Sequence, residues 1–140
     1  MSTTLVSISN DVQRQLNQVE NITGAITLDA EDSGKVFILR AAAGAQITLP
    51  AVASSAGHNY RFIVGSLFAT SAWTIKAASS VIQGGVIVNS AHVAGSDENT
   101  ITFAHAADSI GDWVSLHCDG VNWYVAGQGE KAGAITLTVV

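Results

Sequence analysis

The chain has 140 residues, the size of a single domain; 48% of them are hydrophobic and only 12% are charged. The formal net charge is −5 with only 6 Lys and Arg residues, which argues against a surface that binds nucleic-acid phosphates. No stretch reaches the roughly 18 consecutive apolar residues of a membrane helix, and the N-terminus lacks the pattern of a secretory signal. The surplus of apolar residues predicts burial between subunits of an oligomer.

Cysteine and histidine provide no obvious metal site. The single cysteine, Cys118, excludes an internal disulfide framework. The histidines, His58, His92, His105 and His117, lie far apart and show no zinc-ligand spacing. We expect no metal and no cofactor, with one alternative: a metal on a symmetry axis, where copies of one histidine would meet.

The first residues differ from the rest, and the sequence predicts an N-terminal arm over residues 1–22 followed by a β-domain over residues 23–140. Val12, Leu16 and Val19 fall at a spacing that suits a short helix or a loosely extended segment. One such stripe is too small to fold alone. We expect these three residues to contact a partner or the chain's own domain, and a disordered tail is the alternative.

Beyond the arm the chain is predicted to form nine or ten short strands, separated by turns rich in Gly, Ser and Asn. They lie at 24–28, 35–40, 45–50, 59–65, 72–77, 81–88, 99–104, twice within 111–127, and at 133–140. This spacing predicts an all-β fold, either an antiparallel β-sandwich or a jelly-roll or barrel-like domain.

Three of these segments carry more specific predictions. The segment 35–40 is a continuous apolar run capped by two charges, Lys35 and Arg40, and it indicates a strand that is covered on both faces. The Gly84-Gly85 pair within 81–88 indicates a tight turn or a bulge. Residues 91–100 are polar and are predicted as a surface loop.

The phrase GAITL occurs at 24–28 and 133–137, with the variant GAQITL at 44–49. Its unequal spacing argues against a solenoid, so shared strand chemistry is the preferred explanation. An alternative for the C-terminal copy is pairing with the sheet edge of another subunit.

The segment 111–127, GDWVSLHCDGVNWYVAG, is predicted as a hairpin whose Asp119-Gly120 forms a two-residue turn. This register pairs apolar residues on one face: Cys118 with Val121, Leu116 with Trp123, and Val114 with Val125. The other face carries Trp113, Ser115, His117, Asn122, Tyr124 and Ala126. We expect Val114, Leu116 and Trp123 to lie in the core and Cys118 to be an inert buried thiol.

The same hairpin contains the residue types of a catalytic triad. Ser115, His117 and Asp119 alternate along one strand, however, so neighbours on one face are roughly 6.5–7 Å apart. A triad needs successive hydrogen bonds of about 2.6–3.2 Å. We therefore expect no enzymatic activity.

Two acidic segments keep other chemistries open. Carboxylates at Asp29, Glu31 and Asp32, and at Asp97 and Glu98, lie in turn-like segments where solvated acids are ordinary. Acid–base catalysis is one alternative and contact with a partner's Lys or Arg is another. A calcium site at Asp29 and Asp32 or at Asp97 is a third, although these segments lack a recognisable calcium-loop motif.

Three phrases together bear a likeness to a known class of proteins: AQITLPAVASSAGHNYRFIVG, AWTIKAASSVIQGG and GDWVSLHCDGVNWYVAG. Over about residues 44–127 the chain resembles bacteriophage capsid decoration (cement) proteins, and it shares this look with phage tail-fibre domains. The small size and the polar arm favour the capsid. The resemblance implies a homotrimer that is made in the host cytoplasm, binds the major capsid protein on the virion surface and stabilises the shell. It implies no cofactor, no nucleic acid and no membrane.

The alternative is a trimeric tail-fibre or receptor-binding domain. Trp113, His117, Asn122 and Tyr124 share a predicted face, and aromatic rings beside amides suit glycan binding. The competing explanation is that this face packs against another subunit or sheet. All four residues are candidate partner-binding residues.

Overall fold

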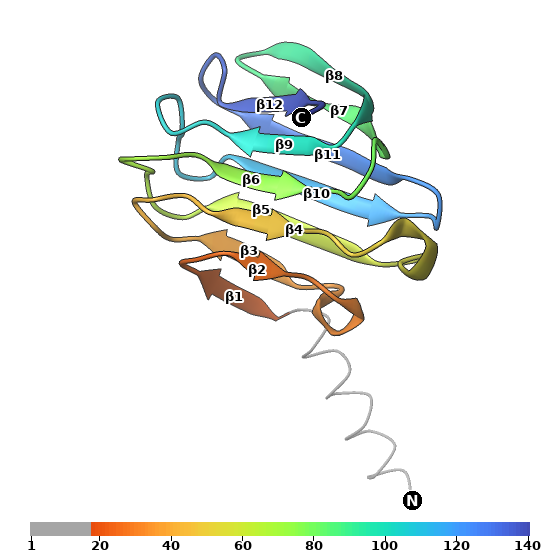
Figure 1. Cartoon of the computed structure of the whole chain (residues 1–140). Coiled ribbons are helices and arrows are strands. Elements are labelled where there is room, and N and C mark those ends of the chain that lie inside the picture. Colours follow the sequence, from red (N-terminus) through yellow and green to blue (C-terminus); the bar gives the residue numbers. More distant parts are fainter. Residues whose placement is uncertain (1–17) are drawn as a thin grey trace, which may run out of the picture.

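The structure is a computed structural model that describes residues 18–140, and these residues form an all-β sandwich (Figure 1). Two short 3₁₀ turns, η1 (Ala30–Asp32) and η2 (Val52–Ser54), interrupt the strands. The strands are β1 (Val19–Ile22), β2 (Ile26–Thr27), β3 (Val36–Leu39), β4 (Gln46–Thr48), β5 (Asn59–Val64), β6 (Trp73–Lys76), β7 (Ile82–Val88), β8 (Ala91–Glu98), β9 (Thr100–Phe103), β10 (Trp113–Cys118), β11 (Trp123–Gly129) and β12 (Ile135–Thr138).

The strands form two sheets that face each other. Sheet A has seven strands in the order β1-β3-β5-β10-β11-β7-β8, and sheet B has five in the order β12-β9-β6-β4-β2. The predicted all-β sandwich is confirmed, but the prediction of purely antiparallel pairing is wrong. Strands β1, β3 and β5 run parallel, as do β2, β4 and β6, and as do β7 and β11. Side-chain alternation along a strand does not encode the direction of its neighbour, so this pairing could not be deduced from the pattern.

The parallel half of the molecule is a flattened coil of three turns (Figure 1). The chain passes from β1 to β2, from β3 to β4 and from β5 to β6, and each step crosses from sheet A to sheet B. Ile26 of GAITL pairs with Ile47 of GAQITL, and Ile47 pairs with Ile75 of the third turn. The first two copies of the phrase therefore occupy stacked positions of successive turns. This stacking does not contradict the explanation by shared strand chemistry; loops of unequal length hide the period of the turns in the sequence.

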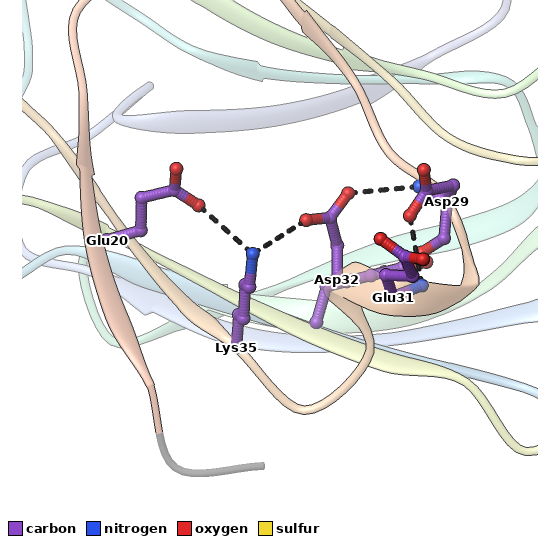
Figure 2. Close-up of polar contacts among 6 residues, drawn as sticks. Glu20, Asp29, Glu31, Asp32 and Lys35 are labelled. Carbon is purple, nitrogen blue, oxygen red and sulfur yellow. Dashed lines mark hydrogen bonds and ion pairs between the residues drawn. The ribbon is translucent and has the colours of Figure 1, made fainter. Parts of the chain in front are cut away.

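The first turn of the coil is held by charged side chains (Figure 2). Asp29 caps η1 by accepting the N–H of Glu31 at 2.9 Å, and Asp32 accepts the N–H of Asp29 at 3.1 Å. Lys35 Nζ lies 2.9 Å from Asp32 Oδ1 and 3.5 Å from Glu20 Oε2. The hydrogen bond to Asp32 raises the pKa of Lys35. These acids thus cap a turn and pair with a lysine that links η1 to β1.

The core lies between the sheets and is rich in aromatic side chains. Trp123 and Tyr60 are buried with ring centroids 5.6 Å apart, and Phe37 stacks on Phe62 at 5.5 Å. The Tyr60 hydroxyl donates a 2.7 Å hydrogen bond to the carbonyl of Asp29. Burial raises the pKa of Tyr60 to about 12, because the phenolate would lose its hydration.

Several boundaries differ from the predictions. Val19–Ile22, assigned to the arm, forms β1, so these residues belong to the sandwich. The predicted polar loop 91–100 is instead the edge strand β8 and the start of β9. The polar residues misled the prediction because a solvent-exposed edge strand carries polar residues as a loop does. The predicted irregularity beside Gly84 is a one-residue register shift between β7 and β8, in which the extra residue lies in β8. The arm residues Val12 and Leu16 lie outside the described residues. Between residues 18 and 140 no helix is long and apolar enough to cross a membrane.

Candidate functional site

The loop between β10 and β11 is wider than predicted. Four residues, 119–122, join the strands instead of the two-residue turn at Asp119-Gly120. Asp119 Oδ1 accepts the N–H groups of Val121 and Asn122, both at 2.8 Å, and Oδ2 accepts the Tyr124 hydroxyl at 2.8 Å. These hydrogen bonds lower the pKa of Asp119, and the bond from the Asn122 N–H has the largest effect. The carboxylate closes the larger loop, while Gly120 supplies the positive φ of 93° that the loop needs.

The wider loop shifts the predicted register by two residues. Cys118 pairs with Trp123 and not with Val121, which is 65% exposed in the loop. An even shift leaves every paired side chain on its own face of the sheet. Val114, Leu116 and Trp123 are fully buried, and Cys118 is a buried free thiol.

The outward-facing side chains of sheet A form the surface that we call the outer face. Two mostly apolar cross-strand rows follow from the pairing registers, beside a polar row of Asn59, His117, Tyr124 and Gln83. The first row runs Asn21, Ile38, Ile63, Trp113, Gln128, Ile87 and His92, and the second runs Val19, Val36, Arg61, Ser115, Ala126, Gly85 and Ala94. Most of these side chains are apolar, and nothing in the described part of the chain covers them as a further layer.

Charge is sparse in the two mostly apolar rows, although Arg40 lies beside them and donates a 3.0 Å hydrogen bond from its Nε to Asn21 of the first row. Arg61 is the only charged residue in the two rows, and its guanidinium carbon lies 4.2 Å from the centre of the Trp113 ring. Asp97, at the far edge, accepts a 2.6 Å hydrogen bond from Gln83. The centres of protein interfaces are enriched in Trp, Tyr and Arg and contain few other charged residues.

The predicted partner-binding residues of the hairpin do not form one cluster. Trp113 begins β10 and His117 lies near its end, about 13 Å away by strand rise. Tyr124 pairs with His117, and Asn122 lies in the adjoining loop. His117, Asn122 and Tyr124 therefore lie at one end of the hairpin and Trp113 at the other. Val19, from the predicted arm, is 60% exposed at the edge of the same face.

A hollow of about 350 Å³ lies at the Trp113 end. Its lining residues are Ile110, Gly111, Asp112, Trp113, Gln128 and Glu130. The Asp112 side chain is buried, and its oxygens accept the N–H groups of Ser109 at 3.1 Å and Glu130 at 3.0 Å. Burial raises the pKa of Asp112. Sequence reasoning missed Asp112; the available signal was a Gly-Asp pair directly before an aromatic strand residue.

The hairpin does not assemble a triad. Ser115 and His117 alternate along β10, and both oxygens of Asp119 are engaged by the loop and by Tyr124. Within residues 18–140, no group of three or more His, Cys, Asp or Glu side chains is arranged to hold a metal ion.

The opposite surface of the sandwich has a different chemistry. The outward positions of sheet B, set by its strand pairings, are hydroxylated apart from Gln46 and Lys76. They are Thr27, Thr48, Thr74, Thr100, Thr102, Thr136 and Thr138. The molecule thus has one largely apolar face and one hydroxyl-rich face.

No family model, no curated protein and no solved structure matches this chain.

Proposed function

We propose that this chain is a structural virion protein that binds the outside of a phage capsid as an oligomer, a homotrimer by its resemblance, and stabilises the shell. The observation that carries the proposal is the outer face of sheet A. It spans seven strands, and its two central rows are mostly apolar and contain one charged residue, Arg61. Such a surface is typical of subunit interfaces.

Strand β3 supports an external partner. Its sequence is a continuous apolar run, which is typical of strands covered on both sides. Phe37 and Leu39 are buried in the core, but Val36 and Ile38 are only half-buried on the outer face. A neighbouring subunit on this face supplies the missing cover.

The difference between the two faces suits a protein at a surface. Apart from the buried Thr100, whose hydroxyl donates to Asn99, the threonines of sheet B lie at exposed or half-buried positions, and their β-branched side chains favour strands. The outer face of sheet A then meets the major capsid protein or another copy of this chain. Contacts that bridge several shell subunits add together, so each can be weak. Binding that prefers the assembled lattice stabilises that lattice by mass action.

The first test is copy number in purified particles, measured by gel densitometry against the major shell protein. We expect copy numbers close to that of the shell subunit. A handful of copies would place the protein in the tail, and complete absence would remove the virion function.

A second test places a charge on each face. Ile87 lies on the outer face and Thr138 lies on sheet B, and both side chains are exposed. The two variants are Ile87→Lys and Thr138→Lys. Added to particles that lack the protein, the Ile87 variant should bind weakly while the Thr138 variant should bind like the wild type. Equal binding of the two variants would mean that the outer face is not the docking surface.

A further inference from the structure

The hollow beside Trp113 has walls of mixed chemistry. Asp112 and Glu130 supply carboxylate oxygens, Gln128 supplies an amide that both donates and accepts, and Trp113 supplies an aromatic wall. Ile110, 68% exposed, adds an apolar rim. We infer that this hollow binds a neutral, hydroxyl-bearing ligand, a sugar residue of a glycan.

The size of the hollow suits a short saccharide unit. Its volume of about 350 Å³ is near the lower end of small-ligand sites, which span about 300–1,000 Å³. The lining residues come from the start of β10, the end of β11 and the loops beside them. The hollow therefore lies at the margin of the outer face, and the inference does not depend on the proposed capsid function.

The charges around the hollow select a neutral ligand. Two carboxyl groups, Asp112 and Glu130, oppose an anion. The Arg61 guanidinium lies outside this lining but stacks on the Trp113 ring, and it partly offsets the two negative charges. Sugar hydroxyls both donate and accept, so they match carboxylate acceptors and the Gln128 amide together.

The site is also largely preformed. Both Asp112 oxygens accept backbone N–H groups, so this carboxyl group of the lining is held in one orientation. The stacked Arg61 side chain orients the Trp113 ring. A preformed aromatic wall beside fixed acceptors lowers the entropy cost of binding. Tyr124, at the other end of the hairpin, already donates its hydroxyl to Asp119 and serves as a control position.

The test uses the full-length isolated protein on a printed array of neutral and anionic oligosaccharides, followed by titration of the strongest neutral hit. We expect Trp113→Ala and Glu130→Gln each to weaken binding at least tenfold, and Tyr124→Ala to change it less than twofold. Glu130→Gln guards against misfolding, because the Glu130 side chain is exposed and only its backbone N–H binds Asp112. Far-UV circular dichroism of each variant checks the fold.

Four results would overturn the inference: no binding on the array, binding to anionic glycans alone, equal weakening by Tyr124→Ala, or full binding by Glu130→Gln. Because the isolated protein is used, none of these results depends on whether the chain occurs in particles. Absence from particles, in turn, would refute the capsid function and leave the glycan site standing.

Discussion

Replacing Gly44 with Ala tests whether the turns of the coil stack as described. An added Cβ would collide with the carbonyl group of Ala72 and would lie 2.6 Å from the backbone nitrogen of Trp73. These atoms belong to the backbone of the next turn, so they cannot rotate away as a flexible side chain would. Overpacking of this kind costs about 1–3 kcal/mol. Weakening the 3.1 Å bond from Gly44 N–H to the Ser71 carbonyl adds about 0.5–1.5 kcal/mol.

The first copy of the same phrase provides a matched control. Gly24 begins GAITL in the first turn, has no atom within 4 Å of an added Cβ, and lies outside the left-handed region. Gly24→Ala should be neutral or stabilise by up to about 1 kcal/mol, since Ala restricts the unfolded chain. We expect Gly44→Ala to lower the free energy of unfolding by about 2–4 kcal/mol, as measured by urea denaturation at constant m-value. If the two variants differed by less than about 0.5 kcal/mol, within the scatter of ordinary surface changes, the stacking would be wrong.

Three further predictions concern the core and the buried polar groups. Trp123→Ala, which removes a fully buried ring beside Tyr60, should cost about 3–5 kcal/mol in chemical denaturation; a loss below about 1 kcal/mol would contradict its place in the core. Asp112→Asn should cost about 1–3 kcal/mol at pH 7, because an amide oxygen can accept from Ser109 or from Glu130 while its NH₂ opposes the other donor. The raised pKa of Tyr60, about 12 in the fold, means that the folded state holds this proton more tightly, so stability should fall as the pH rises from about 10 to 12. Tyr60→Phe should flatten that decline in denaturation curves taken across this range, and an unchanged slope would refute the assignment.

The sequence predicted the sandwich and its core because alternation reports which side of a strand is buried. Val114, Leu116 and Trp123 were placed on the buried face even though the predicted turn was two residues too short. An error of two residues preserves the faces of a strand. The irregular pairing beside Gly84 was also predicted, because a glycine pair inside an apolar run is a local signal.

The sequence could not predict the parallel coil or the hollow. The direction of a strand depends on how the loop before it crosses the sandwich, and the loops before β3 and β5 differ in length and composition. Asp112 is recognised only when the backbone N–H of Glu130, far along the chain, comes within 3.0 Å of its carboxylate. The separation of Trp113 from Tyr124 likewise depends on the register and the strand length.

The outer face exists because the two halves of the molecule share one sheet. The coil supplies β1, β3 and β5, and the hairpin and the strands β7 and β8 supply the rest. The seam between the halves lies where β5 pairs with β10, and there Arg61 of the coil stacks on Trp113 of the hairpin. A partner that covers this face contacts both halves at once, so docking should also resist separation of β5 from β10. Because a ligand that binds only the folded state stabilises it by linkage, the proposed oligomer should unfold at a higher temperature than the isolated chain, and Ile87→Lys should remove that difference.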